Sequence, residues 1–151
     1  MNRSDADDFV ERVIDRWHRN GVQLRPGVRP DELQAFEQRN QIVLPEDMRA
    51  LYLRVDGMNP TDWDDRQVRF WPLADIRRAS EELEAPLNYQ GRVFDCFVFA
   101  DVLIWSFAYG IELSASKTAP AAIYNVGGEE VVKVADTWSE FIQFYLTLRR
   151  P

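Results

Sequence analysis

Two hydrophobic periodicities divide the chain and constrain its fold more than any single motif. In three stretches of the first 57 residues, apolar side chains recur every three or four positions, as on one face of a helix. From Val93 to Ala135 they instead alternate with other residues or run together, which indicates β-strands. The helical period returns after Thr137. This order predicts an α+β domain with N-terminal helices, a central, mainly antiparallel sheet, and a C-terminal helix packed on that sheet.

The predicted helices have capping residues at their ends and apolar residues on one face. The first runs from Ser4, which forms a capping-box-like pair with Asp7, to Asn20-Gly21, and the second runs from Asp31 and Glu32 to Asn40. The third begins at Pro45 and ends at Gly57, which supplies a left-handed residue. The fourth begins at Thr137, which forms a capping box with Glu140. A helical turn or two is also expected from Leu73. The helical period places Trp17, Leu51, Phe141 and Tyr145 on inward faces, so each is expected to be buried.

Five segments have β character. They are Val68–Trp71, Val93–Ala100, Leu103–Glu112, Ala121–Val126 and Glu130–Ala135. In the third segment large residues alternate with small ones, so a helix is expected to pack closely on the small face. The last two segments flank Gly127-Gly128, which is a strong signal for a two-residue hairpin turn.

The composition indicates one globular domain spanning residues 1–151. Hydrophobic residues make up 46% of the chain, enough for a sizeable core, and no linker or repeat divides it. No apolar run reaches the roughly 18–20 residues needed to cross a bilayer. Met1–Asp8 lacks the apolar stretch of a secretory signal, and the single cysteine, Cys96, fits a reducing compartment. We therefore expect a cytoplasmic protein.

The net charge of −7 lies mainly in the second half of the chain. Between Ala79 and Leu148 there are ten acidic residues and only three basic ones. Such a negative field disfavours nucleic acid and anionic membranes as partners. It favours a basic protein partner, or it simply keeps the domain soluble. The use of sixteen arginines against two lysines favours a bacterium with a GC-rich genome.

Residues suited to catalysis or metal binding are sparse. One histidine, His18, and one cysteine, Cys96, are too few for a zinc site built on these residues, and no sequence context supports a Cys–His pair. Asp62, Asp64 and Asp65 lack the ligand spacing of a calcium loop. We therefore expect no enzymatic activity, no cofactor and no metal. A hydrolase with two facing carboxylates stays open, because their separation depends on the fold.

An acidic segment after the third helix contains a tryptophan in an unusual setting. Residues 59–65 read NPTDWDD, with Trp63 flanked by Asp62, Asp64 and Asp65. An aromatic anchor ringed by charges is typical of a binding hot spot, in which the charges assist encounter with the partner. In the alternative interpretation Trp63 folds back to cap the core while its aspartates face water.

Four segments in order resemble the signature of the SUKH superfamily, the Smi–Knr type domain. The first is DELQAFEQRNQIVLPEDMRALYLRVDGMN, in which a helix ending in F-E-x-R is followed by L-P-x-D-x-R-x-L and a polar-Gly pair. The others are VRFWPLADI, FVFADVLIWSFAYGIEL and IYNVGGEEVVKVADTWSEFIQFYL. The resemblance covers about Asp31 to Leu148. Asp56 stands where the family often has Asn, a minor departure because Asp also tolerates turn conformations.

The resemblance implies a non-enzymatic protein-binding domain of α+β fold, and it offers no catalytic residues to carry over. Many bacterial members are immunity proteins that neutralise nuclease- or deaminase-like toxins by direct binding, and fungal relatives serve as interaction hubs in cell-wall signalling. We therefore expect an immunity protein that binds a basic toxin domain; a regulatory adaptor with a host protein partner is the alternative. The oligomeric state is left open. The expected partner-binding residues are Asp62, Trp63, Asp64, Asp65, Glu129 and Glu130.

Overall fold

The computed structural model describes residues 3–148, with side chains from Asp5 onward, and its elements follow the predicted order. The helices are α1 (Arg3–Arg19), α2 (Pro30–Asn40), α3 (Glu46–Arg54) and α4 (Trp138–Thr147). The strands are β1 (Val68–Phe70), β2 (Arg77–Arg78), β3 (Leu87–Tyr89), β4 (Arg92–Phe94), β5 (Phe97–Val102), β6 (Phe107–Ile111), β7 (Ile123–Val126) and β8 (Val132–Ala135). The expected helical turns after Leu73 are two short 3-10 turns, Leu73–Asp75 and Ala79–Glu81, on either side of β2. The predicted pair of Ser4 with Asp7 lies outside the described side chains.

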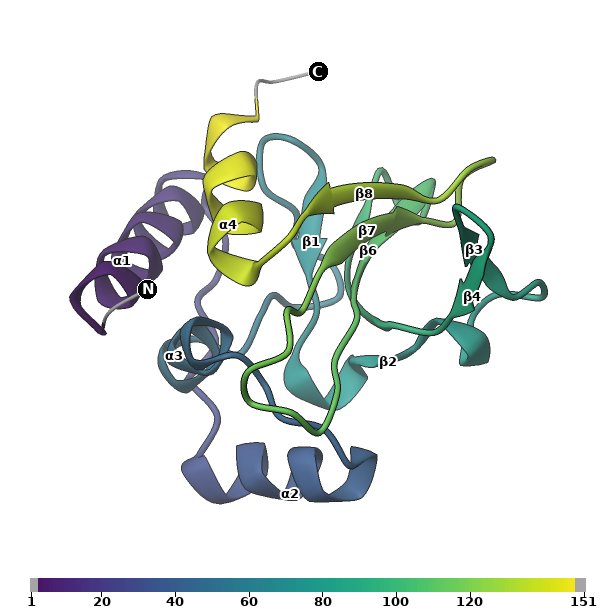
Figure 1. The fold of residues 1–151 in the computed structure, drawn as a ribbon. Helices are drawn as coiled ribbons and strands as arrows, with labels where there is room; N and C mark the ends of the chain where they lie inside the picture. The colour runs from purple at the N-terminus through teal and green to yellow at the C-terminus, as the bar shows by residue number, and fades with distance from the viewer. Residues whose placement is uncertain (1–2, 149–151) are drawn as a thin grey trace.

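Six strands form one antiparallel sheet. Its order is β1-β5-β6-β7-β8, and β2 also pairs with β5, whereas β3 and β4 form a separate hairpin. Figure 1 shows α1 and α4 side by side on one flank of the sheet, α2 at the bottom, and the β3–β4 hairpin on the opposite flank from α1. The predicted α+β fold, with the C-terminal helix packed on the sheet, is confirmed.

The core between the helices and the sheet is centred on Phe70 of β1. Its ring lies 5.2 Å from that of Trp17 on α1, 4.9 Å from that of Tyr145 on α4 and 5.9 Å from that of Phe99 on β5. The four side chains predicted to point inward, Trp17, Leu51, Phe141 and Tyr145, are each at most 2% exposed, so the helical phases are confirmed.

Helix α4 packs on the large face of β6, whereas the sequence predicted a helix on the small face. The ring of Tyr109 lies 5.0 Å from that of Phe141 on α4. On the small face, a Cβ added to Gly110 would stand 2.3 Å from the Sγ of Cys96, so glycine there makes room for the residue that precedes β5. At Gly110 the small face therefore accommodates the side chain of Cys96.

The predicted strand from Leu103 begins only at Phe107. Leu103, Ile104 and Trp105 all have left-handed backbone conformations, with φ of 52°, 52° and 65°. The N–H of Trp105 donates to Oδ2 of Asp101 at 3.1 Å, and this bond helps to hold the chain in a turn between β5 and β6. A local turn therefore overrides the period-two pattern.

Two glycine positions differ from the sequence interpretation. Helix α3 ends at Arg54, before Gly57, because Val55 is extended and forms an isolated bridge with Pro26. Gly57 is left-handed as expected, with φ of 60°, but it serves the close approach of two segments: a Cβ there would stand 2.5 Å from the carbonyl of Trp71. The β7–β8 hairpin is confirmed, with a loop over 127–131 longer than the predicted two-residue turn.

Thr137 caps α4 as predicted, since its hydroxyl accepts the N–H of Glu140 at 3.2 Å. The carboxylate of Glu140 accepts the N–H of Asp136 at 3.0 Å, one residue before the position that a strict capping box requires.

Candidate protein-binding surface at one end of the sheet

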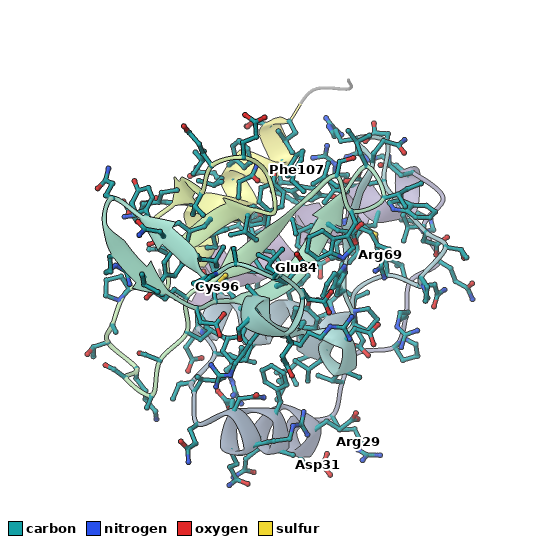
Figure 2. All side chains as sticks on the ribbon, turned by 90° about the vertical axis from the view of Figure 1, so that its right-hand side faces the viewer. Arg29, Asp31, Arg69, Glu84, Cys96 and Phe107 are labelled. Atoms are coloured by element: carbon teal, nitrogen blue, oxygen red, sulfur yellow. The ribbon has the colours of Figure 1, made fainter. Side chains whose placement is uncertain are left out.

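Three connections leave the sheet at the same end. The strand register pairs Val68 with Val102, Val102 with Phe107, and Ala108 with Val126. Because neighbouring strands are antiparallel, the segment 58–67 before β1, the turn 103–106 and the loop 127–131 emerge together. We call these three segments the sheet-end surface. In Figure 2, Phe107, the first residue of β6, lies in the upper part of the molecule, whereas Arg29 and Asp31, at the start of α2, lie at the bottom.

Direct contacts join the three segments of the sheet-end surface. The N–H of Leu103 donates to the carbonyl of Gln67 at 3.0 Å, which links the turn to the first segment. On the other side, the ring of Trp105 lies so close to Gly127 that a Cβ there would stand 3.1 Å from its Cζ3 atom. The candidate residues Asp62–Asp65 and Glu129–Glu130 therefore flank the turn 103–106, although more than sixty residues separate them in the sequence.

Asp64 lies inside the molecule and not at its surface. Its Oδ1 accepts the backbone N–H groups of Arg66 and Val68 at 2.8 and 3.0 Å, and its Oδ2 accepts the hydroxyl of Tyr145. The Nε of Arg16 stands 3.9 Å from the same Oδ2. Donors of this chain therefore occupy the carboxylate, so the fold argues against a direct contact between Asp64 and a partner, and that contact stays an untested prediction.

Tyr145 connects this carboxylate to the two terminal helices. Its hydroxyl accepts the indole N–H of Trp17 at 2.9 Å, and its backbone carbonyl accepts a guanidinium N–H of Arg16 at 3.0 Å. Burial raises the pKa of Tyr145 well above its ordinary value, so the hydroxyl keeps its proton and donates to Asp64. Burial also raises the pKa of Asp64, opposed by these hydrogen bonds and by Arg16. The network fixes the first segment of the sheet-end surface to α1 and α4.

The other charged candidates in this segment are partly compensated. The carboxylate of Asp65 pairs with Arg66 at 2.7 Å and with Arg16 at 3.8 Å, and its N–H donates to Asn20 at 2.8 Å. Asp62 is half-buried, and its carboxylate accepts a long hydrogen bond of 3.4 Å from the backbone of Gln23. The acidic ring expected around Trp63 is thus much reduced.

Trp63 itself is half-buried and lies outside the main hydrophobic core cluster of the described residues. Its indole N–H is buried and has no hydrogen-bond partner within residues 3–148. A tryptophan that caps the core would bury its ring fully, and a free hot-spot anchor would expose more of it. The position of Trp63 is intermediate between the two interpretations.

One exposed part of the sheet-end surface is apolar, and the sequence did not indicate it. The side chain of Ile104 is 75% exposed and that of Leu103 is 47% exposed, which are unusual fractions for such residues. The alternation of large and small residues assigned both to a strand. No glycine or asparagine marks the turn, so the sequence contains no ordinary turn signal here.

A groove of about 590 Å³ runs beside the loop 127–131 and carries three carboxylates. Glu129 and Glu130 come from this loop and Glu84 from the segment before β3. None of the three forms an ion pair with another residue of the described part of the chain. That Glu84 lines the same groove as Glu129 could not be read from the sequence.

A comparison with protein-family models decides the family. The model of the SMI1/KNR4 family (SUKH-1) matches residues 27–143, which is most of the chain. The chain belongs to the SMI1/KNR4 family. The resemblance inferred from the four sequence segments is thereby confirmed, and membership is consistent with a protein-binding domain of the immunity type. A search of curated proteins found no match to this sequence.

The single cysteine and the single histidine of this SUKH-1 domain lie in different settings. The thiol of Cys96 is buried just before the start of β5, whereas His18 is exposed on α1. Burial raises the pKa of Cys96 to about 12, so little of its thiol is ionised at neutral pH. Within residues 3–148 no three His, Cys, Asp or Glu side chains come together in a way that could hold a metal ion. No helix in that range is long and apolar enough to cross a membrane.

Proposed function

We propose that this SUKH-1 domain is a cytoplasmic bacterial immunity protein that binds a basic toxin domain, of the nuclease or deaminase kind, and neutralises it without catalysis. The observation that supports this proposal most is the sheet-end surface. It combines an exposed apolar turn with Glu129 and Glu130, and these two carboxylates, like Glu84 in the adjoining groove, form no ion pair within the described part of the chain.

Charge gives the physical reason for a basic partner. A toxin that acts on nucleic acid needs a positive surface to bind phosphates. Carboxylates without internal counter-ions accelerate encounter with such a surface and discriminate against acidic proteins. Among residues 3–148, Glu84, Glu129 and Glu130 form no ion pair and meet this condition, whereas Asp64 and Asp65 are already paired within the chain.

We expect the gene next to this one to encode the toxin as a C-terminal domain, and the experiment uses that domain; a neighbouring gene without such a domain would count against the proposal. Co-expression of the two proteins in a heterologous bacterium should restore growth, and the purified pair should form a one-to-one complex by calorimetry. Growth arrest in spite of soluble immunity protein, together with no measurable binding, would refute the proposal. Specific binding to a host protein in place of the toxin would favour the regulatory adaptor.

Trp63 and Asp62 are proposed as a second contact at the edge of the same surface. Because Trp63 is only half-buried, a partner can cover the exposed part of its ring. Trp63→Ala should therefore weaken toxin binding by about 2 kcal/mol with little change in melting temperature. A loss of stability with unchanged affinity would instead assign Trp63 to the core.

A further inference from the structure

The turn between β5 and β6 adopts a conformation that bulky side chains disfavour. Left-handed φ values are uncommon outside glycine and asparagine, and a β-branched residue such as Ile104 is an outlier there. Here three consecutive residues, Leu103, Ile104 and Trp105, share it. Burial does not offset the strain at Ile104, because most of its side chain is exposed.

The surrounding structure holds this turn firmly in place. Asp101, at the end of β5, is buried; its Oδ1 accepts the indole N–H of Trp71 at 2.6 Å and stands 3.3 Å from Nε of Arg69. Its Oδ2 accepts the N–H of Trp105, and the hydroxyl of Ser106 donates to the carbonyl of Leu103 at 2.9 Å. The fold thus presents the turn in one preformed arrangement, which lowers the entropic cost of binding.

Strain that a fold maintains without burying the strained side chain indicates a role outside folding. We infer that Leu103 and Ile104 form the apolar anchor through which this protein docks, and that the occupant is a basic protein surface bearing an apolar pocket rimmed by lysine or arginine. This inference rests on the proposed function, since the toxin domain is the protein that would carry that surface.

The charges beside the turn select this occupant over others. The ring of Trp105 joins the turn to the loop of Glu129 and Glu130, whose carboxylates have no cation among the described residues. A second copy of the chain, docked through the same surface about a two-fold axis, would bring these carboxylates together. An anionic membrane would also be repelled. An apolar pocket with a basic rim would bury the side chains of the turn and pair with these carboxylates at the same time.

The test compares variants of the turn with a control of similar exposure elsewhere. The double variant Leu103→Asn/Ile104→Asn introduces asparagine, which tolerates left-handed φ, so the melting temperature should stay the same or rise. Affinity for the purified toxin domain of the neighbouring gene should fall by roughly tenfold or more. Leu53→Gln, on exposed Leu53 of α3, should leave affinity unchanged. Ile104→Ala provides a milder second variant should the double variant melt lower.

A second pair of variants tests the charges. Glu129→Gln/Glu130→Gln should slow association and flatten its dependence on salt, with less effect on dissociation. The matched control is Asp7→Asn/Asp8→Asn, which removes the same charge from exposed positions on α1. Equal effects of both pairs would show that only the total charge matters and would overturn the assigned rim.

The outcomes separate this inference from the proposed function. If the wild-type chain binds the toxin domain and the turn variants bind equally well, the anchor is refuted while the immunity role stands. If the wild-type chain does not bind at all, both fail. If sedimentation shows that the wild-type chain forms dimers which Ile104→Ala dissociates, the occupant is a second copy and the inference is overturned.

Discussion

Replacing Asp64 by alanine should destabilise the protein more than any change at a surface carboxylate. The substitution leaves the buried N–H of Val68 and the hydroxyl of Tyr145 without their acceptor, and it deprives Arg16 of its nearest buried anion. Each orphaned buried group costs about 1–3 kcal/mol, and breaking a buried ion pair about 3–5 kcal/mol. Because these costs overlap, we expect a loss of about 4–6 kcal/mol, a large fraction of the stability of a domain this size.

The measurement is the free energy of unfolding from denaturant titration, with a half-buried neighbour as control. Asp62→Ala removes one long hydrogen bond and should change stability by less than about 0.5 kcal/mol. Tyr145→Phe leaves the indole N–H of Trp17 without its acceptor and should cost about 2 kcal/mol. If Asp64→Ala costs less than about 1 kcal/mol, the carboxylate is not the buried acceptor that we infer.

The same carboxylate should leave a signature in the pH dependence of stability. Because burial raises the pKa of Asp64 above its ordinary value, the folded state binds this proton more tightly than the unfolded chain does. Its contribution to stability is full below the ordinary pKa of an aspartate and is lost as the pH rises through the raised pKa. The difference in unfolding free energy between wild type and Asp64→Asn should therefore move in favour of wild type as the pH falls, and movement the other way would contradict the raised pKa.

Three further predictions concern the core. Leu51→Ala should lower the free energy of unfolding by about 2–5 kcal/mol, as other large-to-small changes in packed cores do; a change below about 0.5 kcal/mol would contradict the packing of α3. Gly110→Ala should lower the melting temperature, since its Cβ would meet the Sγ of Cys96, and Gly110→Ala combined with Cys96→Ala should recover part of the loss. The thiol of Cys96, with its pKa raised to about 12, should resist alkylation at pH 8 until the protein is unfolded; rapid labelling of the native protein would show that the site opens.

Local patterns were sufficient to predict the helices. Each predicted helix combines a sustained apolar period with end signals such as Thr137, and tertiary contacts then reinforce what the local sequence already favours. The turn at Leu103–Trp105 could not be predicted in the same way. Its large residues continue the alternation of the neighbouring strands. The carboxylate of the buried Asp101 helps to hold the turn by accepting the N–H of Trp105, and Asp101 is itself held by Trp71, thirty residues away in the sequence.

The candidate site shows the same limit. The sequence showed that Asp62, Asp64, Asp65, Glu129 and Glu130 are acidic. It could not distinguish an aspartate that faces solvent from one that is buried and hydrogen-bonded within the fold. The carboxylate of Asp64 is paired within the fold because Arg16 and Tyr145, 48 and 81 positions away in the sequence, both contact it. Long-range contacts of this kind have no local signature. Likewise, it is the folded topology that brings Glu84 and Glu129 to the same groove.

The hydrogen bond between Trp17 and Tyr145 spans 128 positions, so the first helix completes its packing only against the last. On the ribosome, α1 and the strands must wait with their apolar faces uncovered until α4 leaves the exit tunnel. Folding that depends on such distant contacts is slow, and the waiting chain is exposed to aggregation and to chaperones. Under the proposed immunity role, protection would therefore lag behind synthesis by the time that α4 takes to emerge and dock. A cell that makes this protein together with a toxin would then gain safety by starting synthesis of this protein first.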